Sequence, residues 1–172
     1  MKLQDNRLLP ANVSLRNQLK PGDIGYLTYL HGILYAQEYG WDYTFEAYVA
    51  VPLAEFAKAH NDRERIWIVE KDGQIAGSVA IVEASLSEAQ LRWMLLTPEL
   101  RGRGIGRFLV EEALDFCKDQ GYSTVFLWTV SLLTVATRLY QSVGFQLTEE
   151  KTHSIWGAQL TEQRYEWHSN NS

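Results

Sequence analysis

Cysteine is nearly absent from this sequence, since Cys117 is the only one among its 172 residues. A single cysteine cannot form an intrachain disulfide, which excludes the class of disulfide-stabilised secreted domains and favours a reducing, cytoplasmic location. Histidine is also scarce, and its four copies are dispersed along the chain. Because protein metal sites need ligands at characteristic spacings, we expect no metal site.

Long apolar runs and an excess of positive charge are missing as well. No run approaches the roughly 20 apolar residues that cross a bilayer, and residues 1–10 lack the apolar centre of a secretion signal. Lysine and arginine number 16 against 21 acidic residues, a net charge of −5. We therefore expect no membrane partner and no nucleic-acid binding by the chain itself. The 46% hydrophobic content suits one soluble domain over residues 1–172.

Against this acidic background, basic residues gather in one short segment, here called the glycine-rich loop. It consists of Arg101, Gly102, Arg103, Gly104, Ile105, Gly106 and Arg107. A strand-like run, 91–97, precedes the loop, and a helix-like run, 108–120, follows it. The N-terminus of a helix presents unpaired N–H groups and a positive dipole end, and glycines let this backbone approach a phosphate closely. The arginines can pair with phosphate oxygens.

Two common phosphate-binding motifs do not fit the glycine-rich loop. The nucleoside-triphosphate loop needs a Lys-Ser or Lys-Thr pair after its last glycine, which is missing here, and the dinucleotide fingerprint needs a third glycine where Leu109 stands. The order that fits is Arg101-x-x-Gly104-x-Gly106. It resembles the acetyl-CoA diphosphate loop of the GNAT family of N-acetyltransferases. The alternative is a surface turn that is merely rich in glycine and arginine.

A second match lies downstream, where Ala136, Tyr140, Gly144 and Phe145 resemble the family's tyrosine-bearing helix and the strand that follows it. The resemblance implies an α/β fold with a mixed, mostly antiparallel sheet of six to seven strands and about four flanking helices. Its central strands would splay around acetyl-CoA. Two segments, 21–25 and 31–42, resemble the acetyltransferase half of proteins that carry a MarR-type winged helix. The few residues before the first expected strand imply that this half stands alone.

The resemblance also implies roles for particular residues. Acetyl-CoA, as cosubstrate, would be bound by Ala136, by the whole glycine-rich loop and by unpaired backbone groups of Leu95, Leu96 and Thr97. Tyr140 would be the general acid that protonates the leaving thiolate. A phenol, with a pKa of about 10, remains protonated at neutral pH and can still stabilise a thiolate. Leu133 departs from the family pattern, because relatives often have an asparagine there that contacts the coenzyme.

The sequence offers several candidates for the general base and for the residues of the acceptor pocket. Relatives often use a glutamate near the position of Gln90 and Arg92, which is absent here. The candidates for the base are Glu38, Glu83, Glu88 and His31. The acceptor pocket is expected between the first two helices and the last hairpin, with His31, Tyr35, Trp41 and Trp128 as its candidates. An aromatic wall there could hold an apolar or cationic acceptor, whereas the alternative is that these aromatic residues simply pack against the sheet.

Hydrophobic periodicity and turn residues predict the elements. Helices are expected at 23–39, at 44–60 with Thr44 as cap and Pro52 as an interruption, at 106–120 and at 131–143. Strands are expected at 12–18, 65–71, 74–84, 89–97, 122–129, 145–151 and 155–167. Asp72-Gly73 predicts a hairpin turn, and the apolar run 122–129 predicts a central strand.

The predicted function is that of an acetyl-CoA-dependent N-acetyltransferase that acts on a primary amine of a small-molecule or amino-acid-like acceptor. The alternatives are an acyl-CoA-binding regulatory module with little turnover and a protein N-acetyltransferase. A homodimer is compatible with the sequence.

Overall fold

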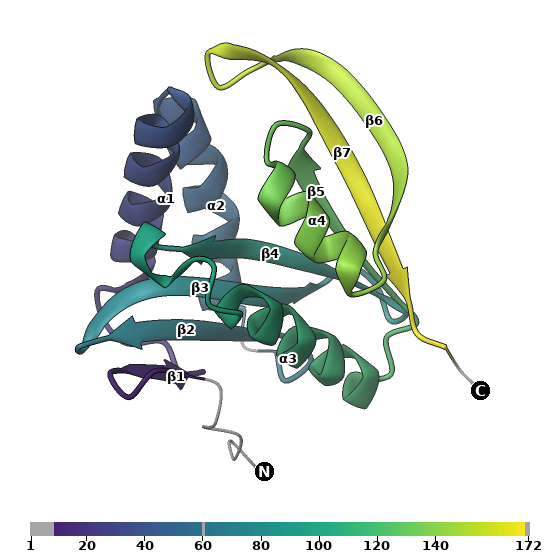
Figure 1. Ribbon diagram of the computed structural model, residues 1–172. Helices are drawn as coiled ribbons and strands as arrows, with labels where there is room; N and C mark the ends of the chain where they lie inside the picture. Colours follow the sequence, from purple (N-terminus) through teal and green to yellow (C-terminus); the bar gives the residue numbers. More distant parts are fainter. Residues whose placement is uncertain (1–8, 60, 171–172) are drawn as a thin grey trace.

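The computed structural model describes residues 9–59 and 61–170 and contains a seven-stranded sheet with helices on both faces (Figure 1). Residues 1–8 lie outside the described part, so the prediction that residues 1–10 lack a secretion signal falls mostly on residues that the structure does not describe. The elements in chain order are β1 (Val13–Arg16), α1 (Asp23–Tyr39), α2 (Tyr43–Lys58), β2 (Arg65–Lys71), β3 (Gln74–Glu83), β4 (Glu88–Leu96), a 3-10 turn (Pro98–Leu100), α3 (Ile105–Gln120), β5 (Thr124–Val130), α4 (Thr134–Ser142), β6 (Gln146–Ile155) and β7 (Ala158–His168).

The strands are ordered β1-β2-β3-β4-β5-β7-β6. Every neighbouring pair is antiparallel except β4 and β5, which run parallel. The expected mixed, mostly antiparallel sheet is therefore confirmed, and β5 is a central strand as its continuous apolar sequence predicted. None of the helices in the described ranges is long and apolar enough to cross a membrane.

Helix α3 shows how the sequence sets an element that matters for the site. It begins after Gly104 and ends at Gly121, and both glycines have left-handed backbones with φ of 80° and 82°. This conformation is costly for residues with a Cβ, so glycine marks both ends. Between them, Leu109, Ala113 and Cys117 are fully buried against the sheet. Packing on this face fixes the helix, and Cys117 is a core residue.

Three predicted details of the elements are wrong. Pro52 does not interrupt α2, because the buried side chains of Val49 and Leu53 hold the helix through the missing hydrogen bond. The N-cap of α2 is Asp42, whose carboxylate accepts from the backbone N–H of Thr44 at 2.9 Å. Strands β6 and β7 extend to a two-residue turn at 156–157, so the expected break at 152–154 does not exist.

The sheet divides at its centre. Strands β4 and β5 pair only through residues 88–90 and 124–126, although β4 continues to Leu96 and β5 to Val130. The register between β3 and β4 shifts between Ser78 and Ala80, and Trp93 has a φ of 50°. These features mark a β-bulge, which bends β4 away from β5. The Ser78 hydroxyl donates to the Trp93 carbonyl at 2.7 Å and stabilises the bulge. The parted strands leave room for a cavity.

Candidate active site

A cavity of about 790 Å³ occupies the space where β4 and β5 part. Its walls come from α1, α2, β4, the glycine-rich loop, β5, α4 and the β6–β7 hairpin. In Figure 1 this hairpin arches over the sheet towards the upper ends of α1 and α2. Segments that are far apart in the sequence therefore enclose one site.

Most of the residues expected to bind the coenzyme line this cavity. They are Leu95, Leu96, Arg101, Gly102, Gly104, Gly106, Arg107 and Ala136. Thr97, Arg103 and Ile105 do not belong to the lining. Ile105 is buried in the core, and the backbone N–H of Thr97 donates to the Ala76 carbonyl at 2.8 Å. The expectation of an unpaired backbone at Thr97 is therefore wrong for its N–H group.

The glycine-rich loop presents an open helix N-terminus to the cavity. The first N–H of α3 with a helical partner is that of Phe108, which donates to the Gly104 carbonyl at 3.1 Å. Earlier N–H groups have no intrahelical partner and are free to bind an anion. A Cβ on Gly106 would lie 3.3 Å from Leu139 and 3.4 Å from Met94, so close packing favours glycine there. Gly104 is required by its φ of 80° instead.

Two of the three loop arginines already pair with carboxylates. The Nη2 atom of Arg101 lies 2.7 Å from Oε1 of Glu38 on α1, and its Nε donates to the Leu96 carbonyl at 3.0 Å. Arg107 pairs with Glu111, one turn further along α3, at 2.8 Å. Direct pairing of either guanidinium with a phosphate would therefore compete with an existing ion pair.

Tyr140 is buried on α4 and borders the cavity. Its ring packs edge-on against Phe145, with ring centroids 5.9 Å apart. No hydrogen-bond partner of its hydroxyl is present among the described residues. Burial, with a smaller contribution from the nearby Tyr35, raises the Tyr140 pKa above its ordinary value. The phenol is therefore protonated at neutral pH and can donate a hydrogen bond into the cavity.

His31 lies in the cavity wall but is poorly placed to act as a base. Its Nδ1 is 2.7 Å from the Leu27 carbonyl and must carry the proton, since a carbonyl can only accept. Its Nε2 has no partner among the described residues and is covered by its surroundings. Desolvation lowers the His31 pKa to about 4, so the ring is neutral at pH 7. A substrate cannot reach the Nε2 lone pair without movement of the wall.

The predicted acceptor-pocket residues His31, Tyr35, Trp41 and Trp128 all line the same cavity. The Tyr35 ring lies 5.0 Å from the Trp41 ring and 4.7 Å from that of Phe45, measured between centroids. These contacts give Tyr35 a packing role at the α1–α2 corner, the place where the end of α1 meets the start of α2. The aromatic residues of this cluster therefore both line the cavity and pack against one another.

Trp156, at the tip of the β6–β7 hairpin, closes the cavity against the α1–α2 corner. Its ring centroid lies 4.7 Å from that of Trp41, 4.9 Å from that of Phe45 and 5.2 Å from that of Tyr48. Its carbonyl also accepts from the backbone N–H of Asp42 at 3.0 Å. The tip therefore roofs the cavity through both ring packing and a backbone bond.

The residues that border the cavity but were not assigned from the sequence include Tyr48, Arg92, Trp156 and Glu162. Glu162 on β7 receives a 2.6 Å hydrogen bond from His153 and lies 3.6 Å from the Lys151 ammonium group. The alternation of side chains along β7 places Glu162 on the same face as the buried Leu160, and this signal was readable in the sequence. The signal for Arg92 was its place in the strand before the glycine-rich loop.

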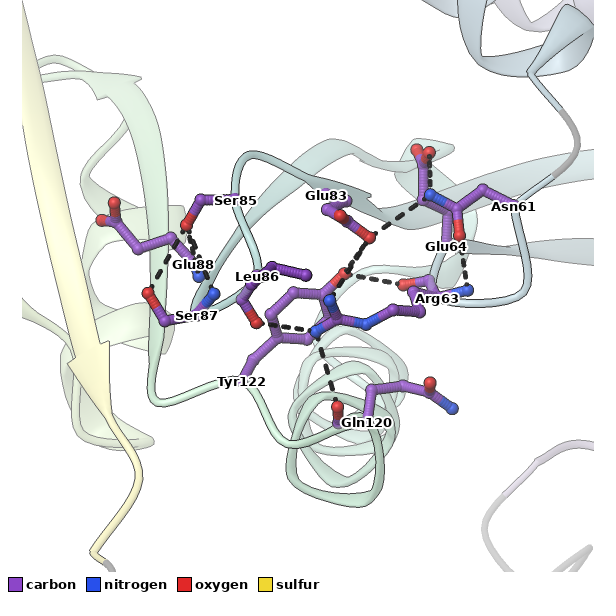
Figure 2. Close-up of polar contacts among 10 residues, drawn as sticks. All are labelled: Asn61, Arg63, Glu64, Glu83, Ser85, Leu86, Ser87, Glu88, Gln120 and Tyr122. Atoms are coloured by element: carbon purple, nitrogen blue, oxygen red, sulfur yellow. Dashed lines mark hydrogen bonds and ion pairs between the residues drawn. The ribbon is translucent and has the colours of Figure 1, made fainter.

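Glu83 and Glu88 lie outside the cavity, at the closed end where β4 and β5 still pair. Figure 2 shows Glu83 within a network that joins Arg63, Asn61 and Tyr122. The Tyr122 hydroxyl donates to the Arg63 carbonyl at 3.0 Å, and the Arg63 guanidinium donates to the Leu86 carbonyl at 2.9 Å. The Glu88 carboxylate lies 3.6 Å from the Arg164 guanidinium, so both glutamates make contacts at the closed end of the sheet and neither lines the cavity.

Comparison with known proteins adds independent observations to this geometry. A family model described as the acetyltransferase (GNAT) family matches residues 32–145. An uncharacterised N-acetyltransferase of Schizosaccharomyces pombe is 31% identical over 151 residues, which are 84% of this chain and 90% of that protein. N-acetyltransferase family 8 member 3 of Rattus norvegicus is 40% identical over 89 residues, or 49% of this chain. The match spans only 39% of the rat protein's length.

Among solved structures, the fold resembles that of spermidine N-acetyltransferase from Vibrio cholerae in complex with CoA and spermine. The TM-score is 0.69 at 21% identity, and the alignment covers 92% of this chain and 96% of that one. At this level of identity the likeness concerns the fold alone. The shared arrangement extends across nearly the whole of both chains.

Proposed function

The chain belongs to the GNAT family of acetyltransferases, and from this membership we propose that it transfers the acetyl group of acetyl-CoA to a primary amine of a small-molecule or amino-acid-like acceptor. The observation that carries the proposal is the 790 Å³ cavity between the parted strands, with an open helix N-terminus on its wall. A diphosphate suits the helix end, and an extended chain that carries a thioester suits the gap between two strands.

The residues present fit acetyl-CoA in three respects. The unpaired N–H groups before Phe108 offer donors to the diphosphate, with Gly102, Gly104 and Gly106 along the cavity wall. Leu95 and Leu96 on β4 line the gap and offer an apolar surface to the pantetheine arm. Ala136 on α4 borders the gap as well, where its small side chain leaves room.

The proposed reaction is direct attack by the neutral amine nitrogen on the thioester carbonyl carbon. A carbon–nitrogen bond forms and the carbon–sulfur bond breaks, so the amine loses one proton and the thiolate gains one. We assign donation to the sulfur to Tyr140, whose protonated hydroxyl has no competing partner among the described residues. A side chain that donates a proton as the carbon–sulfur bond breaks lowers the barrier by stabilising the charge that develops on the sulfur.

The proton acceptor is proposed to be Glu162. Two carboxylates line the cavity within the described ranges, those of Glu38 and Glu162. Glu38 is held by Arg101. His153 and Lys151 both approach Oε2 of Glu162, so its Oε1 atom has no ion-pair partner in the described part of the chain. The carboxylate attracts an ammonium group and can take its proton. His153 is 38% exposed and offers a route for that proton to solvent.

Transfer of acetyl groups to a panel of amines, followed by the release of free coenzyme thiol, tests the proposed function. The panel includes amino acids, aliphatic amines, polyamines such as spermidine, and a peptide with a free N-terminus, because the Vibrio cholerae relative is a spermidine N-acetyltransferase. Acceptor-dependent thiol release supports the proposal. Calorimetric binding of acetyl-CoA without thiol release from any amine would favour the acyl-CoA-binding module, and acetylation of the peptide alone would favour a protein N-acetyltransferase.

A further inference from the structure

Arg92 extends from β4 into the acceptor side of the cavity, next to the bulge at Trp93. Its guanidinium carbon lies 5.0 Å from the Trp93 ring centroid and 5.8 Å from that of Tyr48 on α2. Two aromatic rings from different elements therefore hold the cation in place. A guanidinium positioned in this way keeps its planar donors directed at a ligand with little further loss of freedom.

Within the described ranges, no carboxylate lies within ion-pair distance of Arg92. The other two arginines in the cavity wall differ, since Arg101 pairs with Glu38 and Arg107 with Glu111. A half-buried guanidinium beside aromatic rings loses hydration, and an anionic ligand can compensate for this loss. The cavity therefore presents a positively charged group that the protein itself leaves without a counter-ion.

The phosphates of acetyl-CoA cannot supply this counter-ion if its diphosphate lies at the glycine-rich loop. Arg92 and Thr97, which directly follows β4, are five positions apart, a span of about 16 Å along an extended strand. Figure 1 shows β4 running from its junction with β5 towards this loop. The uncharged pantetheine arm would fill the intervening length. The anion at Arg92 must then belong to the acceptor.

We propose that Arg92 binds the carboxylate of the acceptor, so that the acceptor is an amino acid or a related amine that carries a carboxylate. This inference rests on the proposed function and specifies its substrate class. Arg92 on β4 and Glu162 on β7 bring one cation and one anion to the same cavity, which suits the two charges of a zwitterion. A planar guanidinium and a carboxylate can form two parallel hydrogen bonds, which fixes the orientation of the acceptor.

The test compares amino acids with the amines that remain after their decarboxylation. Phenylalanine with 2-phenylethylamine, and lysine with 1,5-diaminopentane, form two such pairs. For each pair, the ratio of the two kcat/KM values is measured in the wild type, Arg92→Gln and Arg92→Lys. The matched control is Arg138→Gln, which removes a positive charge from the exposed side of α4 outside the cavity.

The wild type is expected to prefer the amino acid, and Arg92→Gln is expected to lower this preference by about 10- to 100-fold, the range for one charged hydrogen-bonded contact. Arg92→Lys retains the charge but not the paired geometry and should lie between the two. Arg138→Gln should keep the wild-type ratio. An equal loss for amino acid and amine would overturn the proposal, because Arg92 would then serve a step common to both.

Failure of this inference differs from failure of the proposed function. Transfer to amines without any preference for a carboxylate contradicts the role of Arg92 and leaves the acetyltransferase activity intact. If no amine is acetylated, calorimetric titration of N-acetylphenylalanine into the CoA-saturated wild type and Arg92→Gln still decides the matter. Weaker binding by Arg92→Gln alone supports the carboxylate site, and equal affinity, or no binding by either protein, overturns it.

Discussion

Arg101 and Glu38 join the glycine-rich loop to α1 through an ion pair in the cavity wall, with Nη2 and Oε1 2.7 Å apart. The Arg101 side chain is 42% exposed and that of Glu38 is 27% exposed, so solvent screens the pair and its contribution to stability is small. Its importance is local. The carboxylate holds a guanidinium that would otherwise be free to pair with a phosphate, and it adds negative charge near the anion site.

Replacing Glu38 by Gln should therefore strengthen acetyl-CoA binding. The change removes the carboxylate that competes for Arg101, and the expected gain in affinity is below about tenfold, because a partly exposed pair is worth about 1 kcal/mol or less. Calorimetric titration measures it. The control Glu55→Gln removes an exposed carboxylate from α2 outside the cavity and should leave the affinity unchanged. Weaker binding by Glu38→Gln would mean that the ion pair organises the loop for the coenzyme.

Gly104→Asp should abolish acetyl-CoA binding in a folded protein. Gly104 has a φ of 80° and precedes the N–H groups proposed to bind the diphosphate, so a carboxylate there would repel the phosphates. Gly104→Ala carries comparable backbone strain, of about 1–2 kcal/mol, without the charge. Its affinity should exceed that of the Asp variant by at least about tenfold. Equal, undiminished affinity in both variants would contradict the placement of the diphosphate.

Local signals account for what the sequence predicted well. The bounds of α1 follow from Gly22 and Gly40, both with left-handed backbones, and the turn at 72–73 follows from an Asp-Gly pair that tolerates positive φ. The glycine-rich loop has the same local character. The bulge at Trp93 depends instead on how β3 and β4 pair and on the Ser78 hydroxyl, which no short segment reveals.

Tertiary packing also explains the site residues that sequence reasoning missed. Trp156 occupies the first position of a two-residue turn with a φ of 54°, where asparagine or aspartate is usual. A tryptophan read in isolation argues against such a turn. The ring contacts with Trp41, Phe45 and Tyr48 compensate for the unfavourable backbone, and those contacts exist only after α1, α2 and the hairpin have come together.

The strained backbone at Trp156 allows a substitution that suits the turn and still impairs acceptor binding. Trp156→Asn places a residue suited to the turn there but removes the roof of the cavity. The KM of the acceptor should rise by about 3- to 10-fold, in line with the loss of one aromatic contact, while the KM of acetyl-CoA stays constant. Steady-state kinetics with each substrate varied in turn measures both. Asp72→Asn, in the equivalent turn between β2 and β3, is the control and should change neither value.

His31 should make the protein less stable in mild acid. Its pKa falls from 6.5 in the unfolded chain to about 4 in the folded protein, because burial disfavours the charged ring. Between these values the unfolded chain binds more protons, so the free energy of unfolding rises with pH. The contribution is complete above pH 6.5 and is lost as the pH falls towards 4, with a slope of up to about 1.4 kcal/mol per pH unit.

Urea unfolding of the wild type, His31→Gln and His31→Phe between pH 4 and pH 8 measures this contribution. Neither replacement titrates, so both should flatten the curve over the same interval even if their absolute stabilities differ. A slope in both variants equal to that of the wild type would show that other groups cause the dependence. Asp23 and Glu99 would then be the next residues to replace, because their pKa values are lowered in the folded protein and their contribution is likewise lost as the pH falls.

Tyr140→Phe tests the proposed general acid with the smallest possible change. The variant keeps the ring and its packing against Phe145, so the fold should survive, as circular dichroism can verify. If the hydroxyl donates to the departing sulfur, kcat should fall by roughly 10²–10⁴, the usual range for a general acid. The affinity for acetyl-CoA should change little, because the hydrogen bond strengthens mainly as negative charge develops on the sulfur.

The leaving group and the pH sharpen this test. Coenzyme thiolate is a fair leaving group, so the loss should lie at the lower end of the range with a strongly nucleophilic amine. Because burial raises the Tyr140 pKa above its ordinary value, the phenol stays protonated through pH 9, and the ratio of wild-type to variant kcat should be constant from pH 6 to pH 9. Wild-type turnover in the folded Phe variant would assign Tyr140 to packing alone, and protonation of the thiolate would then fall to solvent.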